Sequence, residues 1–410
     1  MKPRSAILVV LCLAAGWYNA ARFSSAVMVG LRHGVPDDMY PLWNGSRAAL
    51  KGVDPYGVEV TQQNDFGVYG TTAKAAGDRK GQQFAYPIYA ALAVAPLELV
   101  SFHVANQIAF WLFITIVLLS VGWLRECWDW TTVLIGALCL STYPVIFAIQ
   151  SRQPTILFFG LAVGSFALLR SGCLISAAVL AALSTGKPHI ALPVLLPMLL
   201  WTLVRWKERR RFVISLTASL VGLTAIGIAM TPGWIAGWVS ALRHYAQYAR
   251  GPLVVLCSGS EIGTALSVVL LLGLAAALWR HRQSDLLFQV ALSVSIFQLI
   301  TPYEPYNVVM LLIPAAWIVD NTHEIAESGV VNQIALASLR VALILSWVVN
   351  AVGALLWHTS PEGRSIAWTL PGVMILPLLG CVVAMMLVQL FFPGRRLAAN
   401  LATSRSVGLS

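Results

Sequence analysis

Charged residues are scarce in this sequence. Asp, Glu, Lys and Arg make up 11% of its 410 residues, whereas a soluble domain carries about 25%. Acidic residues are the rarer kind, with 17 Asp and Glu against 27 Lys and Arg. Together with a mean hydropathy of +0.76, this scarcity excludes an ordinary soluble domain and predicts an all-α polytopic membrane protein.

Cysteine pairs and the common cofactor motifs are also missing. The six cysteines include no CxxC pair, so we expect neither a disulfide framework nor a cysteine metal site. A P-loop, GxGxxG, GxSxG and a His-rich metal spacing are absent as well, and we expect no metal and no cofactor. The net charge of +10 predicts no nucleic-acid partner, because the basic residues form short clusters between apolar runs, as in membrane proteins.

Long apolar runs are what the chain has instead. A helix needs about 20 apolar residues to cross a bilayer, and this rule predicts about twelve transmembrane helices. Lys2 and Arg4 precede the first run, which we interpret as a retained helix because no clear signal-peptide cleavage site precedes a soluble domain. The predicted spans are 5–22, 104–123, 131–149, 154–170, 172–186, 188–204, 211–230, 261–280, 284–301, 305–320, 332–357 and 365–392.

The apolar segment 84–100, FAYPIYAALAVAPLELV, decides the predicted orientation. It is short and contains Pro87 and Pro96. If it crossed the membrane, the basic cluster 205–211 would lie outside, against the tendency of basic loops to stay inside. We therefore expect 84–100 to be an interfacial helix on the outer face, with both chain ends in the cytoplasm.

This orientation places one long loop, 31–103, and a second loop, 231–260, outside the membrane. The second loop contains GWVSALRHYAQYARG, whose Trp and Tyr residues suit a helix at the membrane interface. No fixed-period repeat or soluble domain interrupts the chain. We expect residues 1–410 to form a single transmembrane domain whose polar chemistry lies in the outer loops.

Asp37 and Asp38 form an acidic pair just after the first predicted span. A carboxylate within hydrogen-bond reach of a hydroxyl can remove its proton as a general base. Alternatively, an Asp at this position begins the following helix as its N-cap. One could cap while the other acts, so the residues alone leave both interpretations open. Asp54, between Gly52 and Pro55, is interpreted as part of a turn.

Several basic residues lie at the outer ends of spans or in the outer loops. Lys187 stands between Gly186 and Pro188, so we expect a helix break beside it. Its ammonium group could contact a phosphate, or it could extend to the interface as lysines at span ends do. The same two interpretations apply to Arg152, Arg243, His244 and Arg250.

The segment TPYEPYN, 301–307, joins two predicted spans on the outer side. Its Glu304 is either a solvated loop acid or, with Tyr303, part of a substrate-binding site. Both residues are retained as candidates for substrate contact.

Five stretches between about Asp37 and Trp317 resemble the motifs of one known family, in the same order. They are DMYPLWNGSRAALKGVDPYGVEV, QQFAYPIYAALAVAPLELV, QPTILFFGLAVGSFALLRSG, STGKPHIALPVLLPMLLW and TPYEPYNVVMLLIPAAW. The chain thereby resembles glycosyltransferase family 87, once labelled DUF2029, within the GT-C superfamily. The resemblance implies a GT-C-like fold with jaw-type interfacial helices on the outer face.

The resemblance also implies roles for particular residues. The Asp that is the family's presumed base falls on Asp38, by spacing back from Gly52, and the lysine of the K-P motif falls on Lys187, where a donor phosphate could lie. The implied reaction moves mannose, or another hexose or pentose, from a polyprenyl-phosphate sugar to a lipid or glycan acceptor. Some members carry a His in the late turn, where this chain has Tyr303, Glu304, Tyr306 and Asn307.

These expectations place the protein in the plasma membrane of a bacterium, with its active site on the outer, periplasmic face. Its partners would be membrane lipids, the donor lipid and the acceptor. The alternative function is a transporter or flippase for a lipid-linked glycan, which should carry ionisable residues near the bilayer midplane and often shows inverted repeats. A membrane enzyme that transfers another group, such as a phospholipid head group, is the third hypothesis. The few charges within the predicted spans favour the glycosyltransferase over the transporter.

Overall fold

The structure is a computed structural model that describes residues 38–72, 81–140, 142–247, 249–357 and 361–391. Within these ranges the chain forms helices and turns, and the β-structure consists of one isolated bridge between Pro252 and Pro302. The predicted all-α class is therefore confirmed. The predicted first span, 5–22, and Asp37 lie outside the described residues.

The chain forms two compact units, which we describe separately. The loop-bearing unit comprises the described parts of Val29–Trp123 and Ala148–Gly251. The C-terminal unit comprises the described parts of Leu124–Phe147 and Pro252–Ser410. The single transmembrane domain expected from the sequence stays a prediction.

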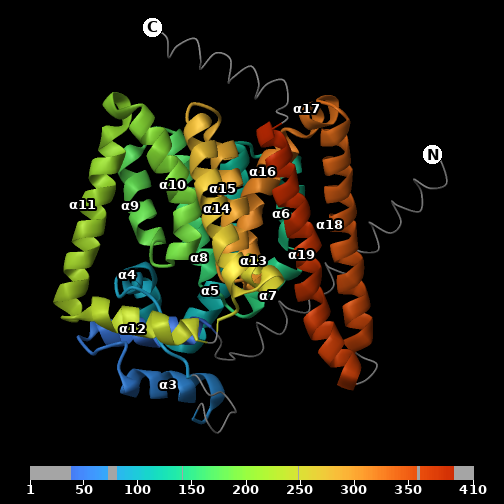
Figure 1. Cartoon of the computed structure of the whole chain (residues 1–410). Helices are drawn as coiled ribbons and strands as arrows, with labels where there is room; N and C mark the ends of the chain where they lie inside the picture. The colour runs from blue at the N-terminus through green and yellow to red at the C-terminus, as the bar shows by residue number, and fades with distance from the viewer. Residues whose placement is uncertain (1–37, 73–80, 141, 248, 358–360, 392–410) are drawn as a thin grey trace. The chain divides into compact units, whose positions relative to one another are not determined.

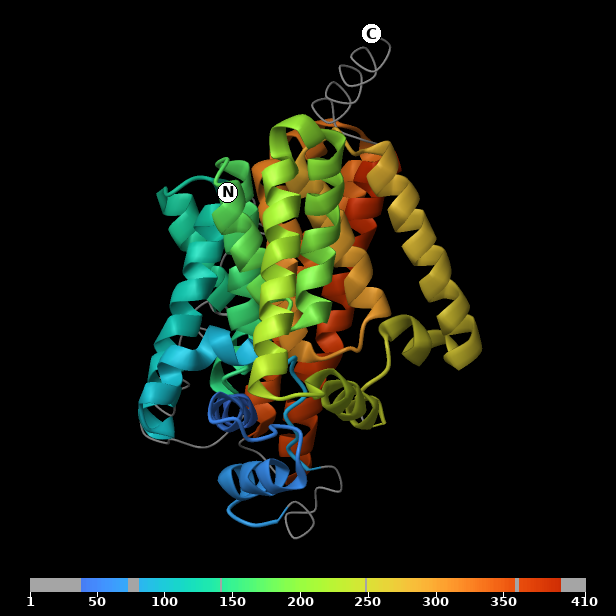
Figure 2. The same ribbon diagram turned by 90° about the vertical axis from the view of Figure 1, so that its left-hand side faces the viewer.

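Upright helices and short crosswise helices make up the loop-bearing unit. Figures 1 and 2 show α12 (Trp234–Ala246) and α3 (Val58–Tyr69) lying across one end of the upright helices. The crosswise helices come from the two predicted outer loops, as does α2 (Met39–Leu50). The upright helices are α5 (Phe102–Arg125), α8 (Thr155–Arg170), α9 (Leu174–Ser184), α10 (Pro188–Val204) and α11 (Trp206–Met230).

The two predicted outer loops pack against each other. A Cβ atom on Gly237 in α12 would come within 2.7 Å of the Tyr56 ring, so only a glycine lets the helix approach this closely. The rings of Tyr89 and Trp234 meet edge to face, with centroids 5.8 Å apart, a favourable aromatic geometry. The crosswise helix α12 is therefore anchored on the first outer loop.

The segment 84–100 contains only a short helical stretch. It forms α4 (Ala90–Val94) and the 3₁₀ helix η1 (Ala95–Leu99). Five α-helical and five 3₁₀ residues together rise at most about 18 Å, well short of the roughly 30 Å hydrocarbon core. This length agrees with the expectation that the segment does not span the membrane.

The C-terminal unit consists largely of upright helices. The long helices α18 (Val330–Trp357) and α19 (Pro361–Phe391) run side by side (Figure 1). The other helices are α6 (Trp130–Leu140), α13 (Leu253–Ser258), α14 (Ser260–Arg280), α15 (Leu286–Ile300), η2 (Pro305–Leu311), α16 (Leu312–Asp320) and α17 (Thr322–Glu327), while α7 (Tyr143–Gln150) crosses the boundary between the units.

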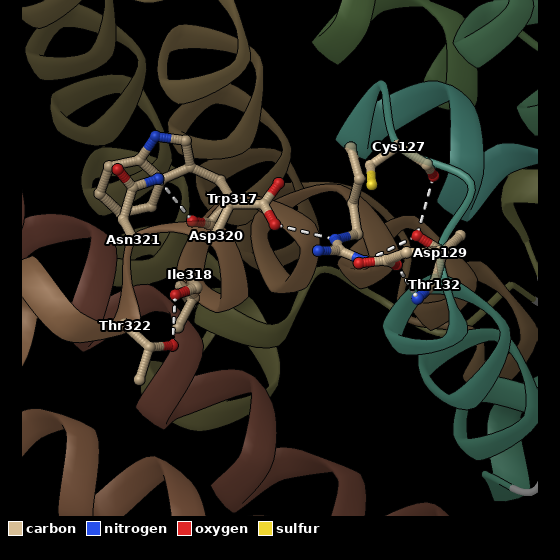
Figure 3. Close-up of polar contacts among 9 residues, drawn as sticks. Cys127, Asp129, Thr132, Trp317, Ile318, Asp320, Asn321 and Thr322 are labelled. Carbon is tan, nitrogen blue, oxygen red and sulfur yellow. Dashed lines mark hydrogen bonds and ion pairs between the residues drawn. The ribbon is translucent and has the colours of Figure 1, made fainter.

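An ion-pair cluster within the C-terminal unit joins the segment 125–132 to the end of α16 (Figure 3). The guanidinium of Arg125 donates to Asp320 at 2.8 Å, to Asp129 at 3.2 Å and to the Thr132 hydroxyl at 2.6 Å. Asp129 also accepts from the backbone N–H of Thr132 at 2.8 Å. These contacts hold together segments that are almost 200 residues apart in sequence.

Three described helices are long and apolar enough to cross a membrane: α5, α11 and α14. A fourth span results if α7 and α8 form one bent crossing. The remaining apolar helices are shorter; α9, for example, has 11 residues and rises about 16 Å. The structure therefore confirms a helical membrane protein, and the count of twelve spans stays a prediction.

Candidate active site

Asp38 stands at the N-cap position of α2, but its side chain makes no capping hydrogen bond. Its carboxylate instead accepts a hydrogen bond from the side-chain amide of Gln153, 115 residues further along the chain. Residue 38 as a whole keeps contact with solvent, although protein atoms surround its carboxyl group closely. This geometry favours a role in chemistry over the capping interpretation.

Gln153 connects Asp38 to Lys187. The Nζ of Lys187 donates to Gln153 Oε1 at 3.4 Å and also to the hydroxyl of Thr155. Lys187 is only 8% exposed and Thr155 is fully buried. Asp38, Gln153 and Lys187, which we call the polar triad, thus bring two predicted site residues together through a third that the sequence did not single out.

Helix starts position each member of the polar triad. Asp38 precedes α2, Gln153 lies two residues before α8, and Lys187 is the N-cap residue of α10, whose first residue is Pro188. A helix N-terminus carries a partial positive charge and free N–H groups. Three such termini in one place favour the binding of an anion.

Gly186, at the break before α10, is closely packed. A Cβ atom at this position would lie 2.4 Å from the ring of Phe158 and 3.1 Å from Cβ of Ala90. Both distances are shorter than normal contacts, so close packing requires a glycine here. The glycine therefore lets the chain pass close to Phe158 and Ala90 immediately before Lys187.

Electrostatics tune the carboxyl group of Asp38. The surrounding protein raises its pKa by desolvation, and the hydrogen bond from Gln153 and the charge of Lys187 partly oppose this rise. A raised pKa makes the carboxylate a stronger base, which is what proton removal from a hydroxyl requires.

Tyr86 is a neighbour of the site that the sequence did not single out. Its pKa is raised by burial and then by the negative charge of Asp38. Its backbone carbonyl accepts from the Tyr56 hydroxyl at 2.7 Å, and its ring stacks on Phe158 with centroids 6.1 Å apart. The only sequence feature that pointed to Tyr86 was its place in the family-like stretch QQFAYPIYAALAVAPLELV.

The Gly52–Tyr56 segment supports the site without entering it. Gly52 has φ +72°, a left-handed conformation that glycine adopts without strain. Asp54 accepts the backbone N–H of Tyr56 at 3.0 Å, which is the turn expected for Asp54. The turn directs Tyr56 to the carbonyl of Tyr86.

Arg152 points to its own loop. Its guanidinium donates to the carbonyls of Ile149 at 3.0 Å and Gln150 at 2.8 Å, and it lies over the ring of Phe110 at 4.6 Å. Arg152 is 3% exposed. These contacts favour a role in shaping the loop before Gln153, and substrate binding by Arg152 stays a prediction.

Arg243 and His244 lie on α12. Arg243 is exposed and lines a recess of about 680 Å³ together with apolar residues of α11 and α12. His244 is half-buried. The contact of Arg243 and His244 with substrate remains a prediction.

Tyr303 and Glu304 belong to the C-terminal unit. Tyr303 is buried and Glu304, which precedes η2, is half-buried. The ring of Tyr306 in the same turn stacks on Phe147 with centroids 6.4 Å apart. The roles of Tyr303 and Glu304 in substrate binding stay predictions. In the part of the chain that the structure describes, no group of three or more His, Cys, Asp or Glu side chains gathers to hold a metal.

Comparison with known protein families identifies the family of this chain. The model of glycosyltransferase family 87 matches residues 84–302, more than half of the chain. The chain therefore belongs to glycosyltransferase family 87, as its motifs indicated. The match covers Gln153 and Lys187 and begins after Asp38.

A solved structure shows a more distant likeness. ArnT from Cupriavidus metallidurans, bound to undecaprenyl phosphate, has 14% sequence identity and a TM-score of 0.39, over 94% of this chain and 77% of its own. A likeness this distant carries no argument about the site. No curated protein matches the chain.

Proposed function

We propose that this protein transfers a sugar from a polyprenyl-phosphate sugar to a hydroxyl group of a lipid or glycan acceptor. The sugar is mannose or another hexose or pentose, and the reaction takes place at the outer face of the bacterial plasma membrane. The observation that carries the proposal is the polar triad. In it, the side-chain amide of Gln153 bridges a carboxylate that can act as a base and a buried ammonium group. Family membership supplies the class of reaction.

The proposed reaction is a single displacement. The carboxylate of Asp38 takes the proton of the acceptor hydroxyl, whose oxygen attacks the anomeric carbon. The bond between that carbon and the phosphate oxygen breaks, and its electron pair leaves with the phosphate. The products are the glycoside, the polyprenyl phosphate and a protonated Asp38, and the anomeric configuration is inverted.

The leaving phosphate is proposed to lie beside Lys187. The ammonium group and the N-termini of α8 and α10 would stabilise the charge that develops on the departing phosphate. Because a lipid phosphate is already an adequate leaving group, we propose that the reaction needs no metal and no cofactor. Tyr86, close to Asp38, would form part of the wall against which the sugar or acceptor lies.

Asp38→Asn tests the proposal directly. Labelled polyprenyl-phosphate sugars are offered to membranes that contain the parent or the variant. We expect the variant to insert normally and to lose at least about 100-fold in turnover, because general-base catalysis typically contributes this much. Parent-level transfer by Asp38→Asn would rule out Asp38 as the base.

The same membranes separate the enzyme from a transporter. Formation of a new glycosidic bond, seen as label in the acceptor, supports the glycosyltransferase. If labelled donor crosses the bilayer at a rate that depends on the protein but no label reaches an acceptor, the transporter hypothesis is correct.

A further inference from the structure

The amide group of Gln153 has two different ends, and each faces the partner that suits it. Its NH₂ group donates to the Asp38 carboxylate, and its oxygen accepts from the Lys187 ammonium at 3.4 Å. The reversed amide would turn the NH₂ group to the ammonium, which only donates, and the oxygen to the carboxylate, which only accepts. One orientation is therefore strongly preferred.

The backbone around Gln153 is held as firmly as its side chain. Gln153 is 4% exposed, its N–H donates to the Ala148 carbonyl at 2.8 Å, and its carbonyl accepts from Ile156 at 3.1 Å. The preceding residue, Arg152, has φ +48°, which is uncommon and costly for a residue other than glycine. The carbonyl contacts of its guanidinium keep this conformation and so fix the direction of Gln153.

We propose that Gln153 is a positioning residue that orients the base and the phosphate-binding lysine at the same time. The inference rests on the function proposed above. Through its two hydrogen bonds, one neutral side chain would influence the pKa of Asp38 and fix the position of the Lys187 ammonium group. Among the described residues, the titratable side chains that interact electrostatically with Asp38 include Lys187, just before α10, and Tyr86, from the segment before α4.

The sign of the expected pH effect follows from the hydrogen bond. A donor to a carboxylate stabilises the charged form and lowers the pKa, as Gln153 does for Asp38. Loss of the donor raises this pKa, so the acidic limb of the pH profile moves to higher pH. A second carboxylate at position 153 would raise it further by repulsion, although it could still pair with Lys187.

The test compares the pH dependence of kcat/KM for the parent, Gln153→Ala and Gln153→Glu. The acidic limb reports the pKa of the base in the free enzyme. We expect it to rise by about one pH unit in Gln153→Ala, equivalent to one charge-assisted hydrogen bond, and further in Gln153→Glu. Glu has nearly the same shape as Gln, so it carries the test if Gln153→Ala fails to insert.

Thr155→Val is the matched control, because it removes a second hydrogen-bond acceptor of Lys187 and leaves the contact between Gln153 and Asp38 intact. It should weaken donor binding without moving the acidic limb. An unmoved limb in both Gln153 variants, or an equal shift in Thr155→Val, would overturn the proposal. Asp38→Asn separates this failure from a wrong function: if that variant stays active, the proposed base is wrong whatever Gln153 does.

Discussion

Lys187 holds a charged group largely out of contact with water, at 8% exposure. A lysine that only extends to the membrane interface would keep its ammonium group in water. Lys187 donates to Gln153 and Thr155 instead, and burying its charge costs free energy that an anionic ligand can recover. The buried position therefore favours the phosphate interpretation.

Substitution of Lys187 tests that interpretation. Lys187→Ala should weaken donor binding about 10- to 150-fold, which corresponds to a charge-assisted contact of about 1.5–3 kcal/mol. Lys187→Arg keeps the charge but changes its shape, so part of the affinity should remain. Donor affinity in detergent is the measurement, with Lys207→Ala, at an exposed position of α11, as control. Parent-like affinity in Lys187→Ala would remove Lys187 from the site.

Glu98 in η1 is a second carboxyl group with an unusual environment. Burial raises its pKa to about 8, although the charges of Arg47 and Lys51 pull in the opposite direction. Both carboxylate oxygens are buried and find no hydrogen-bond partner among the described residues. The folded protein therefore favours the protonated form, and Glu98 should destabilise the fold as pH rises.

The pH dependence of stability tests this reading of Glu98. A raised pKa means that the folded state holds the proton between pH 4.5 and about 8, where the unfolded state has released it, so stability falls across this window. Glu98→Gln cannot ionise, so it should not show this fall in stability with rising pH. Its Tm should match the parent near pH 4.5 and exceed it by about 2 °C above pH 8. Glu59→Gln, at an exposed position of α3, should show no such trend, and a constant difference at all pH values would contradict the argument.

Motif spacing and charge predicted the two ionisable ends of the polar triad. The sequence did not single out Gln153, because an uncharged amide in an apolar stretch gives no electrostatic signal. Its role depends on contacts to residues 115 and 34 positions away. Only the folded chain shows that these three side chains meet.

Helix starts and breaks follow local chemistry closely. Gly186 and Pro188 predicted the interruption that the structure shows between α9 and α10. The helix α11 begins at Trp206 and not at the predicted 211, because Lys, Glu and Arg favour helices although they do not belong to an apolar run. The predicted span 131–149 is divided into α6 and α7, and Pro144 suits a helix start.

Gly186→Ala tests whether the tight break before α10 positions Lys187. The added methyl group must displace the fully buried ring of Phe158, which stacks on Tyr86. Overpacking of this kind costs about 1–3 kcal/mol, so we expect a lower Tm and weaker donor binding. Gly222→Ala is the control, since its Cβ would meet no atom within 4 Å. If the two variants behave alike, the close packing at Gly186 does not matter to the site.

At the scale of the whole molecule, composition was enough to predict a helical membrane protein, and the count of spans was not. The length rule treats each apolar run as a crossing. The structure has apolar helices of 10–17 residues beside the three long ones among its described residues. Such short helices can be tilted, broken or interfacial, and composition does not distinguish these cases.

Accessibility of single cysteines tests the predicted orientation. Cysteine is introduced at Gln62 in α3 or Lys207 in α11, both exposed positions, after the exposed Cys173 and Cys257 have been replaced by serine. A membrane-impermeant thiol reagent should label position 62 in intact cells and position 207 only after the membrane is opened, because basic clusters stay inside. Labelling of position 207 in intact cells would reverse the topology and move the proposed site to the cytoplasm.

The amide between Asp38 and Lys187 also determines where the reaction's proton can go. A carboxamide does not titrate near neutral pH. Gln153 therefore holds the Asp38 carboxylate and the Lys187 ammonium group in place without passing protons from one to the other. On the proposed mechanism, the proton that Asp38 gains in each turnover leaves through water at its exposed side. Each catalytic cycle would then end with the release of one proton to the solvent, while the lysine keeps its charge throughout.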